Sequence, residues 1–111
     1  MQEKLEALFE TLNSVLPGKV SYGTRVGLED DPNYIIYQEL TNRTIVYADD
    51  KSIAKVATFQ VSLITEKKDL SLEERLEASL YFMGYEYELL SEFINEDGSV
   101  NRVYEIKQEV F

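Results

Sequence analysis

Apolar residues near the N-terminus recur with the period of an α-helix. Between Gln2 and Leu16 they are spaced three or four residues apart, at Leu5, Leu8, Phe9, Leu12, Val15 and Leu16. This spacing places them along one side of a helix, and Glu3, Glu6 and Glu10 occupy the other side. Pro17-Gly18 then marks its end. We expect an amphipathic helix whose apolar side packs on the core or, alternatively, lies in a groove of a partner.

After this helix the pattern changes to short runs of strand-forming residues. Lys19–Tyr22 predicts a short strand, whereas positions 24–33 (TRVGLEDDPN) have no period and predict a loop. Such a loop exceeds the usual connection of about 4–6 residues. Tyr34–Leu40 predicts a strand whose first residues are apolar on both faces. Either a helix covers one face and another subunit covers the other, or one face stays partly exposed.

Two more strands are predicted, separated by residues with turn chemistry. Thr41-Asn42 is expected to turn the chain into a strand over 44–48, and Asp49-Asp50-Lys51-Ser52 to turn it again. In the strand that follows, over 54–65, the apolar residues alternate with polar ones and are Ala57, Phe59, Val61 and Leu63. This alternation predicts one apolar and one mostly uncharged polar face.

A second helix is predicted to begin at Ser71. Ser71 and Glu74 have the spacing of a capping box. Apolar residues follow at helical intervals, at Leu72, Leu76, Leu80 and Met83. Gly84 fits the position after the last turn, where a left-handed backbone is least costly for glycine. Phe82 and Met83 are interpreted as packing residues.

The C-terminal residues predict a β-hairpin. Tyr85, Tyr87, Leu89 and Phe93 alternate with Glu86, Glu88 and Glu92. This pattern predicts a half-buried strand with an acidic outer row. Positions 95–99 (NEDGS) predict the turn, because Gly98 tolerates a positive φ. A second apolar row predicts the returning strand and consists of Val100, Tyr104, Ile106 and Val110.

Together these elements predict one α+β domain spanning residues 1–111. Their order is helix, short strand, three-strand meander, helix and β-hairpin. Consecutive strands joined by short turns favour a mainly antiparallel sheet. A chain of 111 residues is long enough for one core of ordinary size.

Charge is distributed unevenly along the chain. There are 21 acidic and 11 basic side chains, which give a formal charge of −10. Only positions 51–69 are net positive, and most of the negative charge lies in positions 70–111. Nucleic-acid binding depends largely on lysine and arginine that displace counterions from phosphates, so we expect no specific nucleic-acid binding. Because no run of about 18 apolar residues occurs, we also expect no membrane-spanning helix.

The residue types present argue against catalysis. Histidine and cysteine are both absent, which excludes an imidazole base, a thiolate nucleophile and cysteine-based metal sites. The glycines form no phosphate-binding motif. Glu29-Asp30-Asp31 and the acidic run over 95–98 lack the spacing of cation ligands and are interpreted as solvated or turn residues. Asp49-Asp50 is interpreted as a turn and not as a carboxylate dyad, because neighbouring residues on a turn seldom share one proton. We expect no enzyme activity, no metal and no cofactor.

Four short runs occur in this order of elements: PNYIIY at 32–37, ADDK at 48–51, VSLITEKKD at 61–69 and GYEY at 84–87. Together they resemble the small tail-completion proteins of long-tailed (siphovirus-type) phages and prophages, which include the tail terminators. The resemblance extends from about Tyr34 to Val110. It implies a virion structural protein that forms a ring, often a hexamer, at the head-proximal end of the tail tube. It also implies the tail-tube and head connector proteins as partners, DNA passing through the ring, and assembly in the host cytoplasm.

A ring requires that one patch of each subunit meet a different patch on its neighbour. We expect the basic residues to face the acidic C-terminal portion of the next subunit, or else to remain in water; they are Lys51, Lys55, Lys67 and Lys68. Tyr34 and Tyr37 are predicted to anchor the same contact. Glu86, Glu88 and Glu92 are predicted to line the lumen, where they repel the phosphates of passing DNA.

Two other classes of protein fit the composition. A small acidic inhibitor, such as a DNA mimic that binds a host enzyme, would also be negatively charged and lack catalytic groups. An enzyme acting through carboxylates would need a deep pocket with convergent acids. Oligomeric state in solution separates the acidic inhibitor from a ring subunit.

Overall fold

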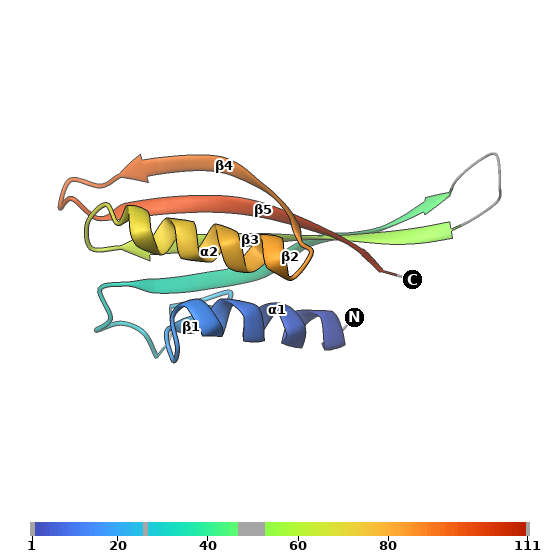
Figure 1. The fold of residues 1–111 in the computed structure, drawn as a ribbon, viewed down its shortest axis with the longest axis horizontal. Helices are drawn as coiled ribbons and strands as arrows, with labels where there is room; N and C mark the ends of the chain where they lie inside the picture. Colours follow the sequence, from blue (N-terminus) through green and yellow to red (C-terminus); the bar gives the residue numbers. More distant parts are fainter. Residues whose placement is uncertain (1, 26, 47–52, 111) are drawn as a thin grey trace.

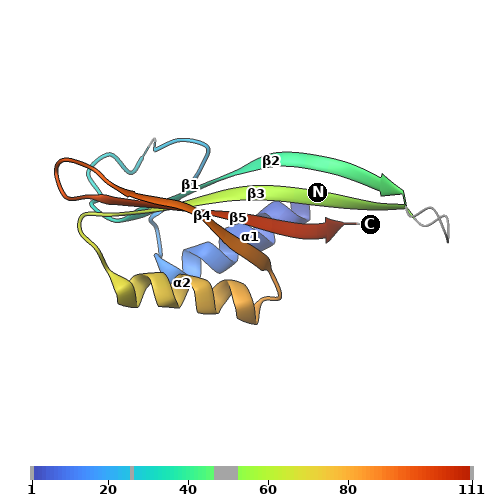
Figure 2. The ribbon, with the colours of Figure 1, turned by 90° about the horizontal axis from the view of Figure 1, so that it is seen from above.

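The computed structural model describes residues 2–25, 27–46 and 53–110 of the chain. The order of elements is α1 (Gln2–Val15), β1 (Val20–Tyr22), β2 (Tyr34–Val46), β3 (Ile53–Thr65), α2 (Leu70–Phe82), β4 (Glu86–Ile94) and β5 (Val100–Val110). Both helices lie on the same side of the sheet (Figure 1, Figure 2). The predicted α+β class is confirmed.

The five strands form one sheet in the order β1-β2-β3-β5-β4. β1 pairs parallel with β2, and the other neighbours pair antiparallel. β2 and β3 form a long hairpin that extends beyond the helices (Figure 1). The molecule is therefore elongated, with principal extents of 52 × 23 × 23 Å.

β2 is one strand where the sequence predicted two. Thr41-Asn42, predicted as a turn, lies inside β2 and pairs with Thr58 and Ala57. The register shifts between Glu39 and Thr41, so Leu40 is the extra residue of a β-bulge. A bulge lets a polar dipeptide pass without breaking the ladder, and the predicted three-strand meander is reduced to two strands. The predicted turn over 49–52 and the end of the strand predicted over 44–48 lie outside the described residues.

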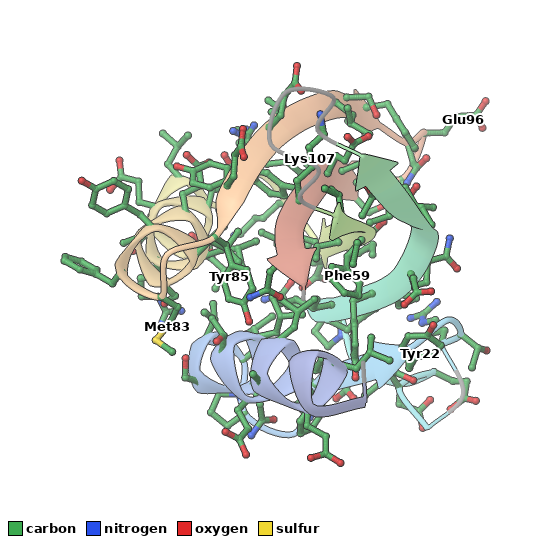
Figure 3. The ribbon with its side chains drawn as sticks, turned by 90° about the vertical axis from the view of Figure 1, so that its right-hand side faces the viewer. Tyr22, Phe59, Met83, Tyr85, Glu96 and Lys107 are labelled. Carbon is green, nitrogen blue, oxygen red and sulfur yellow. The ribbon has the colours of Figure 1, made fainter. Side chains whose placement is uncertain are left out.

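The core lies between the helices and one face of the sheet. Helical residues at the predicted spacing are buried there, namely Leu8, Leu12, Val15, Leu72, Leu76 and Leu80. They pack against the apolar row of β3, which contains Ala57, Phe59, Val61 and Leu63. Figure 3 shows Phe59 pointing from the sheet towards α1. The alternation in β3 is thus confirmed, and so are the two apolar stripes except at Phe9 and Met83, which are exposed.

The opposite face of the sheet, called the open face below, has no helix on it (Figure 2). Thr58, Gln60 and Ser62 of β3 are partly exposed on it. At one end the loop between β1 and β2 covers this face: Leu28 is buried, and the Arg25 guanidinium lies 4.5 Å from the centre of the Tyr34 ring. The second cover expected for the start of β2 is therefore this loop.

The start of α2 differs from the prediction. The helix begins at Leu70, and the side chain of Asp69 accepts a hydrogen bond of 3.0 Å from the Leu72 backbone N–H. Asp69, not Ser71, therefore occupies the N-cap position. Gly84 follows the last turn with φ of 81°, as predicted for a left-handed position.

Candidate subunit interface

Two stretches of sheet edge have no partner strand among the residues that the structure describes. β4 is the outermost strand on one side, and its outer edge is unpaired along its whole length. On the other side β1 pairs only with Ile35, Ile36 and Tyr37 of β2. Beyond these residues the Tyr22 hydroxyl accepts a 3.3 Å hydrogen bond from the Glu39 N–H, and β2 continues to Val46 without a neighbour on that edge.

Large apolar side chains are exposed along β4 and at the end of α2. In β4 they are Leu89, Leu90, Phe93 and Ile94, and around the end of α2 they are Tyr81, Phe82 and Met83. Phe82 is the most exposed, at 82%. The seven side chains are between 42% and 82% exposed.

A groove of about 360 Å³ separates α1 from the end of α2. Its lining residues are Ala7, Glu10, Thr11, Ser14, Ser79, Phe82 and Met83. Met83 lies beside both helices and outside the core (Figure 3). The exposed Phe82 and Met83 therefore border a concave surface.

Behind β4, a cluster of charged residues ties β4 and β5 to α2. Arg102 of β5 donates hydrogen bonds to Tyr104 Oη (2.6 Å), Glu92 Oε1 (2.8 Å) and Glu77 Oε2 (3.1 Å). The Tyr104 hydroxyl in turn donates to Glu77 Oε2 at 2.6 Å. Because Glu92 belongs to β4 and Glu77 to α2, Arg102 joins three elements.

Lys68 completes this cluster from the segment before α2. Its ammonium group lies 2.8 Å from Glu73 Oε2 and 2.6 Å from Glu92 Oε1. Hydrogen bonds from Lys68 and Arg102 lower the pKa of Glu92, and hydrogen bonds to Glu73 and Glu92 raise the pKa of Lys68. Burial raises the pKa of Tyr104 well above its usual value, and its hydrogen bond to Glu77 adds to this. Burial opposes charge on Arg102, but its bonds to Tyr104 and Glu92 outweigh that effect and raise its pKa.

The predicted interface tyrosines lie inside the subunit. Tyr37 belongs to the core, where its ring meets that of Tyr22 edge-on at 5.1 Å between centres, and burial raises its pKa. Tyr34 lies on the open face beneath Arg25 and is also buried. Both rings therefore have little area left for a neighbouring subunit. Their apolar character reflects packing within the chain.

The predicted interface lysines are not brought into one exposed patch. Lys68 is bound to Glu73 and Glu92 of its own chain. Lys67 is exposed and forms no ion pair with any described residue. Lys51 and the side chain of Lys55 lie outside the described residues. The pairing of these lysines with a neighbour stays a prediction, and Lys67 is the member free to make it.

The three predicted lumen glutamates do not share a face. The pairing of β4 with β5 shifts between Leu89 and Ser91, so Leu90 is the extra residue of a second bulge. Before the bulge, Glu86 and Glu88 lie opposite Lys107 and Glu105 on the open face. After it, Glu92 lies opposite Arg102 on the helix side. The predicted alternation is therefore interrupted, because a bulge moves every later side chain to the other face.

The exposure of three apolar residues at the end of α2 was missed by sequence reasoning. Phe82 and Met83, interpreted as packing residues, are exposed, as is Tyr81. Tyr81 and Phe82 fall outside the buried stripe of Leu76 and Leu80, which was a signal available in the sequence. Met83 continues the stripe in spacing but is the C-cap residue that follows α2, and it is 62% exposed.

Acidic residues elsewhere are engaged locally. In the loop before β2, Asp31 pairs with Lys19, and the Glu29 carboxylate accepts a 3.0 Å hydrogen bond from the Gly27 N–H. Within the described ranges, no group of three or more acidic side chains is placed to hold a metal ion. Neither α1 nor α2 is long and apolar enough to cross a membrane.

Comparisons with known proteins complete this description. No family model matches the chain, and no curated protein matches it. A search of solved structures finds a similar chain in the virion of a native gene transfer agent (GTA) particle. The two chains are 12% identical with a TM-score of 0.47, and the match covers 89% of this chain and 84% of the other. Similarity at this level is too low to assign a function.

Proposed function

We propose that this chain is a structural subunit of a phage or prophage virion that assembles with copies of itself into a ring. The observation that carries the proposal is the uncovered apolar surface along the unpaired edge of β4 and at the end of α2. Exposed apolar patches larger than a few hundred Å² mark sites of association in soluble proteins. An unpaired strand edge adds a row of free backbone donors and acceptors to this surface.

The finer assignment is a tail terminator or tail-completion protein that caps the tail tube and joins it to the head connector. The sequence runs described above support this assignment by resemblance. In this role DNA passes through the ring without specific binding, and a formal charge of −10 suits such a passage because it repels phosphates. The subunit acts by assembly and not as an enzyme. Its location is the head-proximal end of the tail, after assembly in the host cytoplasm.

Mass measurement in solution tests the proposal. Sedimentation or mass photometry, with and without magnesium, is expected to give a closed oligomer, and electron microscopy with purified tail tubes is expected to show rings at one end. Phe82→Ser is expected to reduce assembly, whereas Arg75→Ser on an exposed position of the same helix is not. A chain that stays monomeric under all these conditions, tubes included, would contradict the proposal.

An acidic inhibitor remains the competing class, and the same measurements separate it. A DNA mimic stays small and leaves its target as salt is raised, because its contacts are mainly charge pairs. The exposed residues at the end of α2 favour assembly, since they are apolar and uncharged. A small particle released from a host enzyme by salt would favour the inhibitor.

A further inference from the structure

We propose that the outer edge of β4 in one copy pairs antiparallel with the outer edge of β2 in a second copy, with Glu88 opposite Arg43. The inference rests on the proposed ring and names the contact that closes it. The paired residues are Glu86 to Ser91 of β4 and Thr41 to Ile45 of β2. The chain thus supplies both halves of the contact from its two unpaired strand edges.

The direction of the strands fits this pairing. Within the sheet β2, β3, β5 and β4 alternate in direction, so β2 and β4 run opposite ways. Copies related by rotation about an axis to which the strands are inclined, as in a barrel, keep these directions. β4 of one copy and β2 of the next therefore meet as antiparallel neighbours, which is the same pairing found throughout the rest of the sheet except at β1.

The faces of the two strands also fit. Asn42 pairs with Ala57, which is in the core, so the next register position, Arg43 opposite Val56, belongs to the open face. Glu88 pairs with Glu105 on the open face as well. With Glu88 opposite Arg43, the open face therefore continues from one copy into the next. A shift by one residue would reverse every position.

The two bulges fall at the same end of this ladder. Leu90 is the extra residue of β4 and Leu40 that of β2. In the proposed register Ser91 lies opposite Thr41. Both residues belong to the open face, so the two strands still present matching faces beyond the bulge in β4. The ladder ends there, because the N–H of Glu39, two residues before Thr41, already donates to the Tyr22 hydroxyl.

Charge gives this pairing its preference over a two-fold contact between two β4 strands. Glu88 lies directly opposite Glu105 within its own sheet and makes no ion pair with any described residue. Like charges opposite each other on a sheet are destabilising. Arg43 is the one basic residue in β2, and it brings a cation to this pair. Two β4 strands would instead add more glutamates.

The register also produces the stagger that a closed sheet needs. Glu88 pairs with Glu105, which pairs with Gln60 of β3, whereas Arg43 pairs with Val56 of β3. Successive copies are therefore displaced along the strands by the four positions that separate Gln60 from Val56. A sheet closes into a ring only with a stagger of this kind.

Disulfide cross-linking tests the register directly, because the chain has no cysteine of its own. A chain carrying both Glu88→Cys and Arg43→Cys is expected to form covalent ladders of subunits on mild oxidation. These two positions cannot cross-link within one subunit, since three strand spacings, about 14 Å, separate them, and a disulfide needs Cα atoms within about 7 Å. The matched control, Glu88→Cys with Thr44→Cys, places the thiols on opposite faces and is expected to cross-link at least tenfold less.

Charge exchange gives an independent measurement. Arg43→Glu is expected to weaken association on the order of fivefold, the size of one cross-strand charge pair. Adding Glu88→Arg to that chain is expected to restore it, whereas adding Glu96→Arg, in the turn between β4 and β5, is not. If Glu96→Arg also restores association, the effect of Arg43→Glu depends on the net charge of the chain and not on a contact with Glu88. That result would overturn the proposed contact.

The outcomes separate this contact from the proposed function. A ring of normal mass that yields no cross-link between positions 88 and 43 overturns the contact and leaves the ring standing. Dimers formed by Glu88→Cys alone show two-fold pairing of β4 and also overturn it. A chain that never assembles, with or without tail tubes, overturns both.

Discussion

Replacing Arg102 with methionine removes the cation that joins β4, β5 and α2. The side chain is 16% exposed and makes hydrogen bonds of 2.6, 2.8 and 3.1 Å to Tyr104, Glu92 and Glu77. Breaking a buried ion pair by removing one partner costs about 3–5 kcal/mol. Here Glu77 and Glu92 are 31% and 27% exposed and regain water, and Glu73 keeps Lys68. We therefore expect Arg102→Met to lower the free energy of unfolding by about 2–3 kcal/mol, which is less than for a fully buried pair.

Urea denaturation of the dilute, monomeric chain measures this loss. The midpoint is expected to fall while the slope m stays constant, because the surface exposed on unfolding does not change. Lys107→Met is the matched control: this neighbouring cation is 51% exposed and lies 3.8 Å from Glu105, so its loss costs less than about 0.5 kcal/mol. Arg102→Lys keeps the charge without the planar fork and is expected to fall between the two. An Arg102→Met chain as stable as the Lys107→Met control would refute the reasoning.

Three further predictions concern single residues. Asp69→Ala is expected to lower the free energy of unfolding by about 1 kcal/mol because it removes the cap of α2, whereas Ser71→Ala is expected to change it very little. Equal losses of stability in urea denaturation would contradict the assignment of Asp69 as the cap. Gly98→Ala is expected to cost about 1–2 kcal/mol, because Gly98 has φ of 90°, and no change in melting temperature would contradict this. Burial raises the pKa of Tyr104 above its unfolded value of 10.0, so above pH 10 the unfolded chain loses this proton before the folded chain does. Stability is therefore full below pH 10 and falls as pH rises further, and Tyr104→Phe is expected to flatten that fall in urea curves taken across this range.

The elements with a long, regular pattern were predicted well. The alternation in β3 and, apart from the exposed Phe9, the apolar stripe of α1 identified residues that pack on the core, because each pattern matches the geometry of its element over several turns or pairs. Gly84 and Gly98 were also placed correctly, at positions of positive φ. These features depend on a residue and its immediate neighbours along the chain.

The errors share a different cause. The turn predicted at Thr41-Asn42 and the acidic outer row predicted to include Glu92 both failed because a bulge, at Leu40 and at Leu90, keeps the strand intact while changing its phase. A bulge depends on the partner strand across the ladder. No local pattern of apolar and polar residues marks it.

The candidate interface shows the same division. Tyr34 and Tyr37 have the composition of interface residues but are covered by the chain's own loop and helices. Phe82 and Met83 have the composition of core residues but lie beyond the end of the packed stripe. Composition therefore identified apolar residues, and only their place relative to distant elements separated covered ones from uncovered ones.

By itself, the sequence determined the class of the domain, the positions of both helices, the apolar row of β3 and the excess of negative charge. Each of these follows from short-range periodicity or from residue counts. Tertiary structure alone decided which strand edges are unpaired, which face each glutamate of β4 occupies and which aromatic residues remain exposed. The physical reason is that burial and register are set by contacts between segments far apart in the chain, and a single bulge or one covering loop reverses the outcome without altering the local pattern.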